Sequence, residues 1–449
     1  MQMTTTHPAP GAAAVSLKEA TRFWWQLGWL SFGGPAGQIA LLHRELVEQR
    51  RWLSERRYLH ALNYCMLLPG PEAMQLATYL GWLMHGVPGG LIAGGLFVLP
   101  SVLVLTALSS AYAIWGHVPL LTAVFATLKP AVLAIVAMAA WRLGRRVLRT
   151  PLQRLLAIKA FVALALLRLP YPLVVATAAL VGWAAGRWRP SWIAAPAAHG
   201  AVAAGHTDAL ALHGDATPTP EHARFSRRRL ALTLLIWALA LLIPLGALAA
   251  WGGWDGPLAL MGRFFTRVAL LSFGGAYAVL PYVAQGAVEH FGWLSASQML
   301  DGLALGETTP GPLIMVVAFV GFMGGWQSQL LGGPGSWLAA VAALLVAVWF
   351  TFLPSFGFIL AGGPLVERSR GDLRIAAPLT AISSAVVGVI ASLAVFFAGP
   401  VLLPGGQLQP LNLAVLLASL VALLRWRWGV LQLIGAAVLL GVVRQLLGW

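Results

Sequence analysis

The chain has 449 residues, of which 59% are hydrophobic and only 10% are charged, and its mean hydropathy is +0.80. Soluble globular proteins carry about 25% charged residues, so the composition excludes ordinary soluble domains and indicates a polytopic membrane protein. The net charge of +15 does not indicate nucleic-acid binding, because the basic residues lie in short stretches between apolar runs and no segment could form a soluble basic face.

A short polar tail, residues 1–17, opens the chain without the apolar region of a signal peptide. The apolar runs that follow predict helices, because the bilayer core leaves backbone groups no other partners. Those of the first part are 22–42, 59–85, 90–115, 119–141, 153–168 and 171–186. After a polar linker, 187–229, the remaining runs are 230–251, 258–283, 297–325, 336–362, 376–399, 411–424 and 428–447.

The first and last parts of the chain are two copies of one unit. Residues 22–71 match residues 263–312 without a gap, at an offset of 241 and with 17 identities in 50 positions. The matched motifs are Ser31-Phe32-Gly33-Gly34 with Ser272-Phe273-Gly274-Gly275, Trp52-Leu53-Ser54 with Trp293-Leu294-Ser295, and Pro69-Gly70-Pro71 with Pro310-Gly311-Pro312. We therefore predict a first transporter repeat, 18–186, and a second, 252–449, joined by the linker and a linking transmembrane helix, 230–251.

The repeat continues to the end of the unit. After an insertion the match resumes at an offset of 254, where Leu99-Pro100-Ser101 falls on Leu353-Pro354-Ser355. Near the end, Ala165-Leu166-Leu167-Arg168 falls on Ala422-Leu423-Leu424-Arg425.

The placement of arginine indicates that the two copies are inverted. The loop 43–58 carries five arginines and its counterpart, 284–297, carries none. The reverse holds for the next pair of loops, because 116–118 has no arginine and its counterpart, 363–375, has several. By the positive-inside rule the same loop therefore faces opposite sides in the two copies. The predicted fold class is all-α, with two inverted-topology repeats in a bacterial inner membrane and with the N-terminus and the linker in the cytoplasm.

One apolar run cannot be a simple crossing. The loop 43–58 is predicted inside and 116–118 outside, yet two apolar runs lie between them. We favour 59–85 as the exception, because Pro69-Gly70-Pro71 must interrupt its helix. Run 22–42 has a similar break at Gly33-Gly34-Pro35. Thirteen crossings, or fewer crossings with re-entrant hairpins, both remain open.

The repeated breaks predict a central anion site between the two halves. A broken helix leaves half-helix ends at membrane depth, and a half-helix N-terminus presents free N–H groups and the positive end of the helix dipole. A single Pro-Gly-Pro could be a mere kink or a close-packing device, but its repetition in both halves favours function. The predicted substrate-binding residues are Gly33, Gly34, Pro69, Gly70, Pro71, Gly274, Gly275, Thr308, Thr309, Pro310, Gly311 and Pro312.

The few charges inside apolar runs are candidates for coupling or gating. Glu72 and Glu307 flank equivalent breaks and could carry a coupling proton, although Glu72 could equally cap a half-helix. Thr308 and Thr309 could contact an oxyanion or bond a preceding carbonyl. Lys129 could be a substrate counter-charge or could snorkel to the interface. Arg22 and Arg263 fit an anion gate or, as we favour, an interfacial anchor.

No metal or cofactor site is predicted. The linker holds His199, His206, His213 and His222, but their wide spacing and the lack of cysteines favour a flexible connector over a metal site. The chain has a single cysteine, Cys65, and therefore no internal disulfide. Motifs for ATP binding or soluble hydrolysis do not occur.

Taken together, the motifs resemble those of the chromate ion transporter family, in particular its long-chain, two-domain members. The resemblance is carried by Phe32-Gly33-Gly34-Pro35, Pro69-Gly70-Pro71-Glu72-Ala73, Ser272-Phe273-Gly274-Gly275-Ala276-Tyr277 and Gly306-Glu307-Thr308-Thr309-Pro310-Gly311-Pro312. It implies export of chromate across the inner membrane, resistance to chromate, and sulfate as competitor or exchange partner. It also implies a functional role for the glycines and prolines of these motifs and for Glu307.

The residues by themselves predict less: an inverted-repeat secondary carrier for a small anion, since backbone dipoles and hydroxyls suit sulfate, molybdate or phosphate as well. An anion channel would share the same site. An integral-membrane enzyme acting on a lipid-linked phosphate is disfavoured, because Glu72, Glu307 and Asp301 are too sparse for such a centre. The lipid bilayer is the expected surrounding, nucleic acid is not an expected partner, and a homodimer is one option for an oligomeric state that the sequence leaves open.

Overall fold

The structure, a computed structural model, describes residues 15–193, 212, 220–368 and 376–448. These residues fold into helices without a β-strand, which confirms the all-helical, polytopic class. Most of the tail and the linker, with His199, His206 and His213, and residues 369–375 of the loop 363–375 lie outside the described residues.

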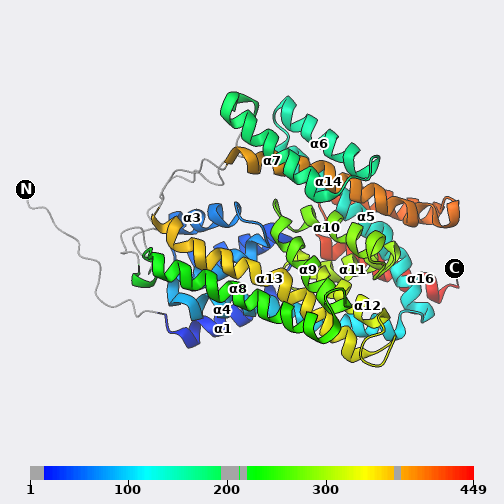
Figure 1. The fold of residues 1–449 in the computed structure, drawn as a ribbon. Helices are drawn as coiled ribbons and strands as arrows, with labels where there is room; N and C mark the ends of the chain where they lie inside the picture. The colour runs from blue at the N-terminus through cyan, green and yellow to red at the C-terminus, as the bar shows by residue number, and fades with distance from the viewer. Residues whose placement is uncertain (1–14, 194–211, 213–219, 369–375, 449) are drawn as a thin grey trace, which may run out of the picture.

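The first half begins with short helices, continues with two long ones, α4 and α5, and ends with two of intermediate length (Figure 1). Its elements are α1 (Leu17–Leu30), α2 (Gly34–His43), the π-helical η1 (Arg44–Gln49), α3 (Glu55–Cys65), α4 (Glu72–Trp115), α5 (Pro119–Val147), α6 (Pro151–Ala165) and α7 (Tyr171–Trp188). Two short turns, η2 (Pro190–Trp192) and η4 (Glu221–Ala223), and the helix α8 (Arg227–Gly252) follow.

The second half repeats this order of elements. It comprises α9 (Pro257–Leu271), α10 (Ala276–Ala284), η5 (Gln285–His290), α11 (Ala296–Thr308), η6 (Leu313–Met315), α12 (Val316–Gln327), α13 (Trp337–Arg368), α14 (Ala376–Leu402), η7 (Pro404–Gly406), α15 (Pro410–Leu424) and α16 (Val430–Leu446). The repetition includes the unusual π-helical segments, since η1 and η5 lie 241 positions apart. The repeated sequence thus produces the same series of local structures twice.

The predicted helix breaks are present in both halves. The helices stop on either side of each Ser-Phe-Gly-Gly and each Pro-Gly-Pro motif. Gly70 and Gly311, the central residues of the two Pro-Gly-Pro motifs, have φ angles of +131° and +102°. Only glycine adopts such angles readily, so the motif requires glycine between its prolines.

Helix α4 folds back on itself and is in effect two helices. His85 and Gly86 have non-helical backbone angles, and Gly81 on one arm lies against the Gly89 backbone on the other. The arms, 72–84 and 87–115, are therefore antiparallel neighbours. This reversal lies at the boundary between the predicted runs 59–85 and 90–115.

Five helices are long and apolar enough to cross a bilayer, namely α4, α5, α8, α13 and α14. Shorter apolar helices cover 313–327, 410–424 and 430–446. At about 1.5 Å of rise per residue they are shorter than a hydrocarbon core of about 30 Å. The lengths therefore favour fewer full crossings with shorter or re-entrant helices over thirteen simple crossings.

Two reciprocal backbone hydrogen bonds join the halves at the breaks. The Gly70 N–H donates to the Ser272 carbonyl over 3.0 Å, and the Gly311 N–H donates to the Ser31 carbonyl over 2.7 Å. These four residues form two pairs related by the offset of 241. Each half thus supplies the partner that the broken helix of the other half lacks, which matters because an unpaired backbone group in a bilayer costs several kcal/mol.

Buried side chains reinforce the same junction. Ser101 donates to the Pro310 carbonyl of the other half, and Gln75 Nε2 donates to the Pro69 carbonyl over 2.7 Å and to Ser355 Oγ over 3.3 Å. Gln38 Nε2 bridges the Gly311 carbonyl, over 2.5 Å, and the Ser31 carbonyl, over 3.1 Å. The Pro-Gly-Pro breaks are therefore closely packed rather than open to solvent.

The halves also exchange their terminal helix pairs. Helices α6 and α7 of the first half pack on α14 of the second, and α15 and α16 of the second half pack on α5 of the first (Figure 1). Helix α8, which has no buried residue, lies against α13 and α9. An apolar helix with so little burial is suited to face lipid.

Replacing Gly311 with alanine should destabilise the protein and impair its activity. The left-handed φ costs a non-glycine residue roughly 1–3 kcal/mol, and the added methyl group would collide with Ser101 Oγ at the junction. The melting temperature of the purified protein in detergent measures the effect. Gly95→Ala, at a helical glycine with no atom within 4 Å of the new methyl group, is the matched control and should melt like the wild type. Equal melting of all three proteins would contradict this account of the junction.

Candidate functional site

A cavity of about 700 Å³ lies between the two halves and is called here the central cavity. Residues of α2, α3 and α5 form much of its wall, and Tyr277 and Glu307 come from the second half. Three first-half residues that the sequence predicted to bind the substrate or to couple transport border this cavity, namely Gly33, Gly34 and Glu72.

Two carboxylates from different halves meet in this cavity. Glu72 is the first residue of α4, and a methyl group placed on Gly275 would lie 4.0 Å from Glu72 Oε1. Glu307, near the end of α11, accepts a hydrogen bond from the Tyr277 hydroxyl of α10. Glu72 and Glu307 therefore converge on the start of α10 although 235 positions separate them in the sequence.

Two helix N-termini without side-chain caps open at the same place. Helix α2 begins after Gly33, and Gly33, Gly34 and Ala36 border the cavity. Helix α10 begins after Gly275, with Tyr277 in its first turn. The first N–H groups of a helix have no partner within it and carry the positive end of its dipole. Both helices thus direct donors and partial positive charge to the region around the carboxylates.

Arg142 and Arg146 of α5 add full positive charge to the cavity wall. Four residues apart on one helix, they lie on the same face. The Arg146 guanidinium is within electrostatic range of Glu72, and that of Arg142 is within range of the Tyr277 hydroxyl. The sequence analysis missed them, because the apolar run that it predicted as a helix ended at 141. Their spacing of four was the signal that could have identified a helix face.

A histidine held between two carboxylates contributes to the same cavity. His43 lies 3.1 Å from Glu48 and 2.6 Å from Glu55, and all three residues border the cavity. His43 therefore fixes the positions of Glu48 and Glu55 at this wall of the cavity.

The Pro-Gly-Pro residues do not border the central cavity. Pro69, Gly70, Pro71, Pro310, Gly311 and Pro312 are buried at the junction between the halves. The Thr308 and Thr309 hydroxyls donate to the carbonyls of Leu305, over 2.7 Å, and Gly306, over 2.9 Å. Of the two roles considered for these threonines, the structure shows the bond to a preceding carbonyl. Gly274 lies beside Ser383 on α14.

The remaining charged candidates lie elsewhere. Lys129 of α5 pairs with the buried Asp301 of α11 over 3.5 Å, and the Tyr112 hydroxyl donates to the same carboxylate over 2.8 Å. This pair links the halves and does not border the cavity. A paired ammonium in this position is neither a snorkelling side chain nor a free counter-charge.

The two repeated arginines do not border the cavity either. Arg263 donates to Asp255 over 3.1 Å and to the Trp254 carbonyl over 2.8 Å, with its guanidinium 4.7 Å from the Trp254 ring centre. These contacts are those of an interfacial anchor, the role favoured for it above. Arg22 is exposed on α1.

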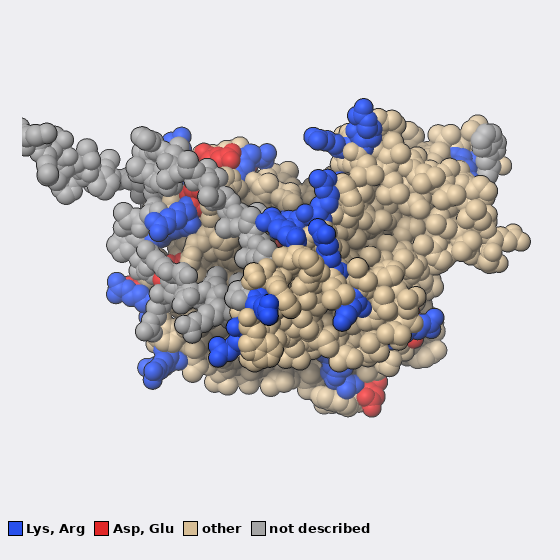
Figure 2. Space-filling model, turned by 90° about the horizontal axis from the view of Figure 1, so that it is seen from above, with Lys and Arg blue, Asp and Glu red and all other residues tan. Residues whose placement is uncertain are grey.

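Within the described part of the chain, no group of three or more His, Cys, Asp and Glu is arranged to hold a metal ion. His222, the linker histidine that the structure describes, donates a hydrogen bond to the Trp82 carbonyl over 2.9 Å. Basic side chains gather across one face of the molecule, seen in Figure 2, with fewer acidic ones among them.

Comparison with known proteins identifies the family. A family model for the chromate transporter matches residues 18–183 and 259–442. The chain belongs to the chromate transporter family. The two matched segments fall on the two repeated halves, and both of them contribute residues to the central cavity.

Chromate transporters of several bacteria are similar along most of their length. A probable chromate transport protein of Synechococcus elongatus is 30% identical over 420 residues, which are 93% of this chain and 91% of the relative. A chromate transport protein of Cupriavidus metallidurans is 30% identical over 85% of this chain and 84% of its own length. One from Pseudomonas aeruginosa is 34% identical over 81% of this chain and 77% of its own length. No solved structure matches the chain.

A thiol introduced at Ala139 should report on access to the central cavity. Ala139 borders it, whereas Ala134, on the same helix, is fully buried. In a Cys65→Ser background, Ala139→Cys should react with a membrane-impermeant maleimide in everted vesicles, in which the cytoplasmic face is outermost. The matched variant Ala134→Cys should not react. Equal labelling of both positions, or labelling of neither, would contradict a water-filled cavity that opens to the cytoplasm.

Proposed function

We propose that this protein is a secondary transporter that exports chromate across the bacterial inner membrane, with sulfate as competitor or exchange partner. The observation that carries the proposal is the central cavity of a chromate transporter family member, where two uncapped helix N-termini and two arginines meet Glu72 and Glu307. Transport is supported by the relatives, which are named as chromate transport proteins.

Anion binding is supported by the type and placement of the donors. A tetrahedral dianion presents several acceptor oxygens, which the first N–H groups of α2 and the guanidinium groups of Arg142 and Arg146 would satisfy. Charge-assisted hydrogen bonds of this kind each contribute roughly 1.5–3 kcal/mol. The same donors suit sulfate, so the two dianions should compete for the cavity.

The export direction is supported by the charge of the substrate. A membrane potential contributes about 2.3 kcal/mol per elementary charge per 100 mV. A dianion leaving a cytoplasm that is negative inside therefore gains roughly twice that amount at 100 mV. The predicted cytoplasmic opening of the central cavity, next to the arginines of α5, places the loading site on the side from which this gradient drives export.

The carboxylates link anion occupancy to protons. When ionised, Glu72 and Glu307 repel a bound dianion; when protonated, each loses its charge and gains a donor. Binding of the anion and protonation of the carboxylates therefore favour each other. Because the two side chains come from different halves, a movement between the halves would change both at once.

Chromate uptake into everted membrane vesicles tests the proposed function. Respiration makes the interior of such vesicles positive, so radiolabelled chromate should accumulate inside, and excess sulfate should suppress the accumulation more than chloride at equal ionic strength. Vesicles from cells that lack the protein are the control. Failure to accumulate chromate in vesicles shown to contain the protein would exclude chromate export.

Glu307→Gln should lower chromate uptake and weaken its dependence on pH. Glutamine cannot exchange a proton, and it carries no charge that changes with pH. The loss of the proton step should appear as a flatter dependence of the initial uptake rate on pH than in the wild type. Initial uptake rates measured across a pH series give both effects. Glu19→Gln, at an exposed glutamate of α1, is the matched control. If the two variants share the wild-type pH profile, Glu307 has no role in coupling.

A further inference from the structure

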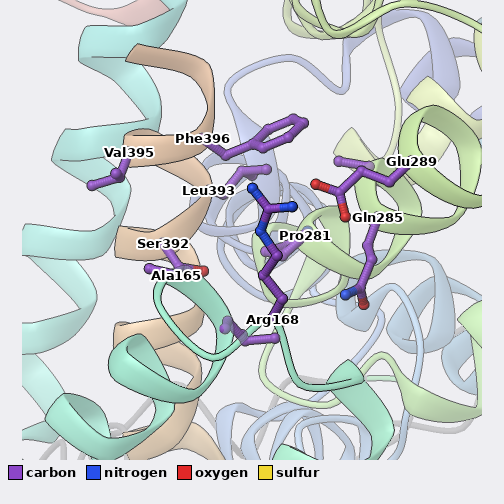
Figure 3. Close-up of a pocket in the computed structure, with 11 residues that line it drawn as sticks. Ala165, Arg168, Pro281, Gln285, Glu289, Ser392, Leu393, Val395 and Phe396 are labelled. Carbon is purple, nitrogen blue, oxygen red and sulfur yellow. The ribbon is translucent and has the colours of Figure 1, made fainter. Parts of the chain in front are cut away.

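The structure contains a second cavity between the halves, of about 270 Å³, called here the Arg168 cavity (Figure 3). It lies between the α6–α7 turn of the first half and the helices α10, η5 and α14 of the second. None of its lining residues borders the central cavity. The sequence analysis had noted Arg168 only as part of a repeated motif, Ala165-Leu166-Leu167-Arg168.

The Arg168 cavity is the repeat-related counterpart of the central cavity. Glu289 in its lining stands 241 positions after Glu48, which borders the central cavity. Leu393 and Phe396 stand 254 positions after Ala139 and Arg142, the offset of that part of the repeat. The fold therefore builds a cavity at the same place in each half, one wide and one narrow.

The predicted inversion sends the two cavities to opposite sides of the membrane. The central cavity is bordered by the arginine-rich loop 43–58 and the Arg168 cavity by its arginine-free counterpart 284–297. A carrier with inverted repeats exposes its binding region to each side in turn. A wide cavity on one side and a narrow one on the other is the asymmetry expected of such a carrier when it faces the cytoplasm.

The two cavities obtain their positive charge from different helices. Phe396 occupies the position equivalent to Arg142, so α14 brings no cation to the Arg168 cavity. The α6–α7 turn supplies one instead: Arg168 extends into the cavity toward Glu289 and Phe396 (Figure 3). Arg168 has a φ of +50° and Arg427, in the equivalent turn of the second half, has one of +54°, so this conformation belongs to the turn in both halves.

The groups that face Arg168 leave it available to an anion. Glu289, Gln285 and Ser392 are the polar residues that share the cavity with it. Within residues 15–193, 212, 220–368 and 376–448, Arg168 makes no ion pair within 4.0 Å and no side-chain hydrogen bond, and neither does Glu289. An adjoining cavity of about 400 Å³ shares Gln285 and Glu289 and brings in Arg267, which is hydrogen-bonded to Tyr282.

We propose that the Arg168 cavity is a second subsite for a small oxyanion, at the opposite mouth of the transport path, with Arg168 as its anion-binding residue and Glu289 as a competing carboxylate. Arg168 attracts the anion that leaves the central cavity. Glu289, across the same space, competes for the guanidinium and weakens the complex, so that the anion is released rather than retained. This proposal rests on the proposed function, which supplies the substrate class, a small oxyanion.

Protection of a thiol by sulfate tests the subsite directly. Ala165 borders the Arg168 cavity, and its repeat counterpart, Ala422, is buried and borders neither cavity. In a Cys65→Ser background, Ala165→Cys should react with a membrane-impermeant maleimide in right-side-out vesicles. Sodium sulfate should slow that reaction, and sodium chloride at equal ionic strength should not. Ala422→Cys should stay unlabelled.

Variants at the two charged positions should shift the half-protecting sulfate concentration in opposite directions. Arg168→Asn, which keeps a residue that tolerates the positive φ, should raise it about tenfold or more. Arg168→Lys should restore part of the loss, and Glu289→Gln should lower the concentration below that of the wild type. Arg425→Asn, at the equivalent turn of the second half and outside the lining of the Arg168 cavity, should leave it unchanged.

Three outcomes would overturn the inference. Sulfate could protect Ala165→Cys equally in the presence and in the absence of the Arg168→Asn change, or chloride could protect it as well as sulfate does. The third is a thiol that reacts only in everted vesicles. Because protection requires no net movement of chromate, the two proposals can fail separately. Arg168-dependent protection without chromate uptake would keep the subsite and remove the proposed substrate. Chromate uptake without protection would keep the proposed function and remove the subsite. Glu289→Gln leaves the turn at Arg168 untouched, so it decides the matter even if Arg168→Asn does not fold.

Discussion

The structure depends on the need to satisfy backbone groups wherever a helix is interrupted inside the membrane. A Pro-Gly-Pro segment removes donors and leaves carbonyl and N–H groups that water cannot reach, at a cost of several kcal/mol each. The protein meets this need by pairing one break with another: Gly70 bonds to Ser272, and Gly311 bonds to Ser31. Each half therefore supplies backbone partners for the broken helices of the other.

This pairing separates two roles that the sequence had assigned to the same motifs. The Pro-Gly-Pro segments are buried in the junction, whereas the Phe-Gly-Gly breaks leave the N-termini of α2 and α10 uncapped beside Glu72 and Glu307. One break therefore fastens the halves, and the other provides donors at the centre. The junction and the cavity thus lie side by side, with the backbone of the Pro-Gly-Pro breaks satisfied and the N-termini at the Phe-Gly-Gly breaks left to the cavity.

Charge is sparse in the membrane-embedded part, and most of it is committed to specific partners. Lys129 is paired with Asp301, Arg263 with Asp255, and His43 with Glu48 and Glu55. Burial of an unpaired charge is expensive, so such pairing is expected. Three arginines border the two cavities, namely Arg142 and Arg146 of α5 in the central cavity and Arg168 of the α6–α7 turn in the other. The two cavities therefore receive positive charge from positions that the repeat does not relate.

The sequence by itself determined the membrane class, the duplicated unit, the positions of the helix breaks and the family, because apolar runs, glycine and proline act through local backbone physics and leave a periodic signal in the chain. It also identified Glu72 and Glu307 as isolated charges. Only the tertiary structure decided that Gly33, Glu72, Tyr277 and Glu307 share one cavity, that α5 extends far enough to bring Arg142 and Arg146 into it, and that Lys129 is paired with Asp301. Those facts depend on contacts between residues far apart in sequence and on the exchange of helix pairs between the halves, and no local pattern encodes which helix of one half packs against which helix of the other.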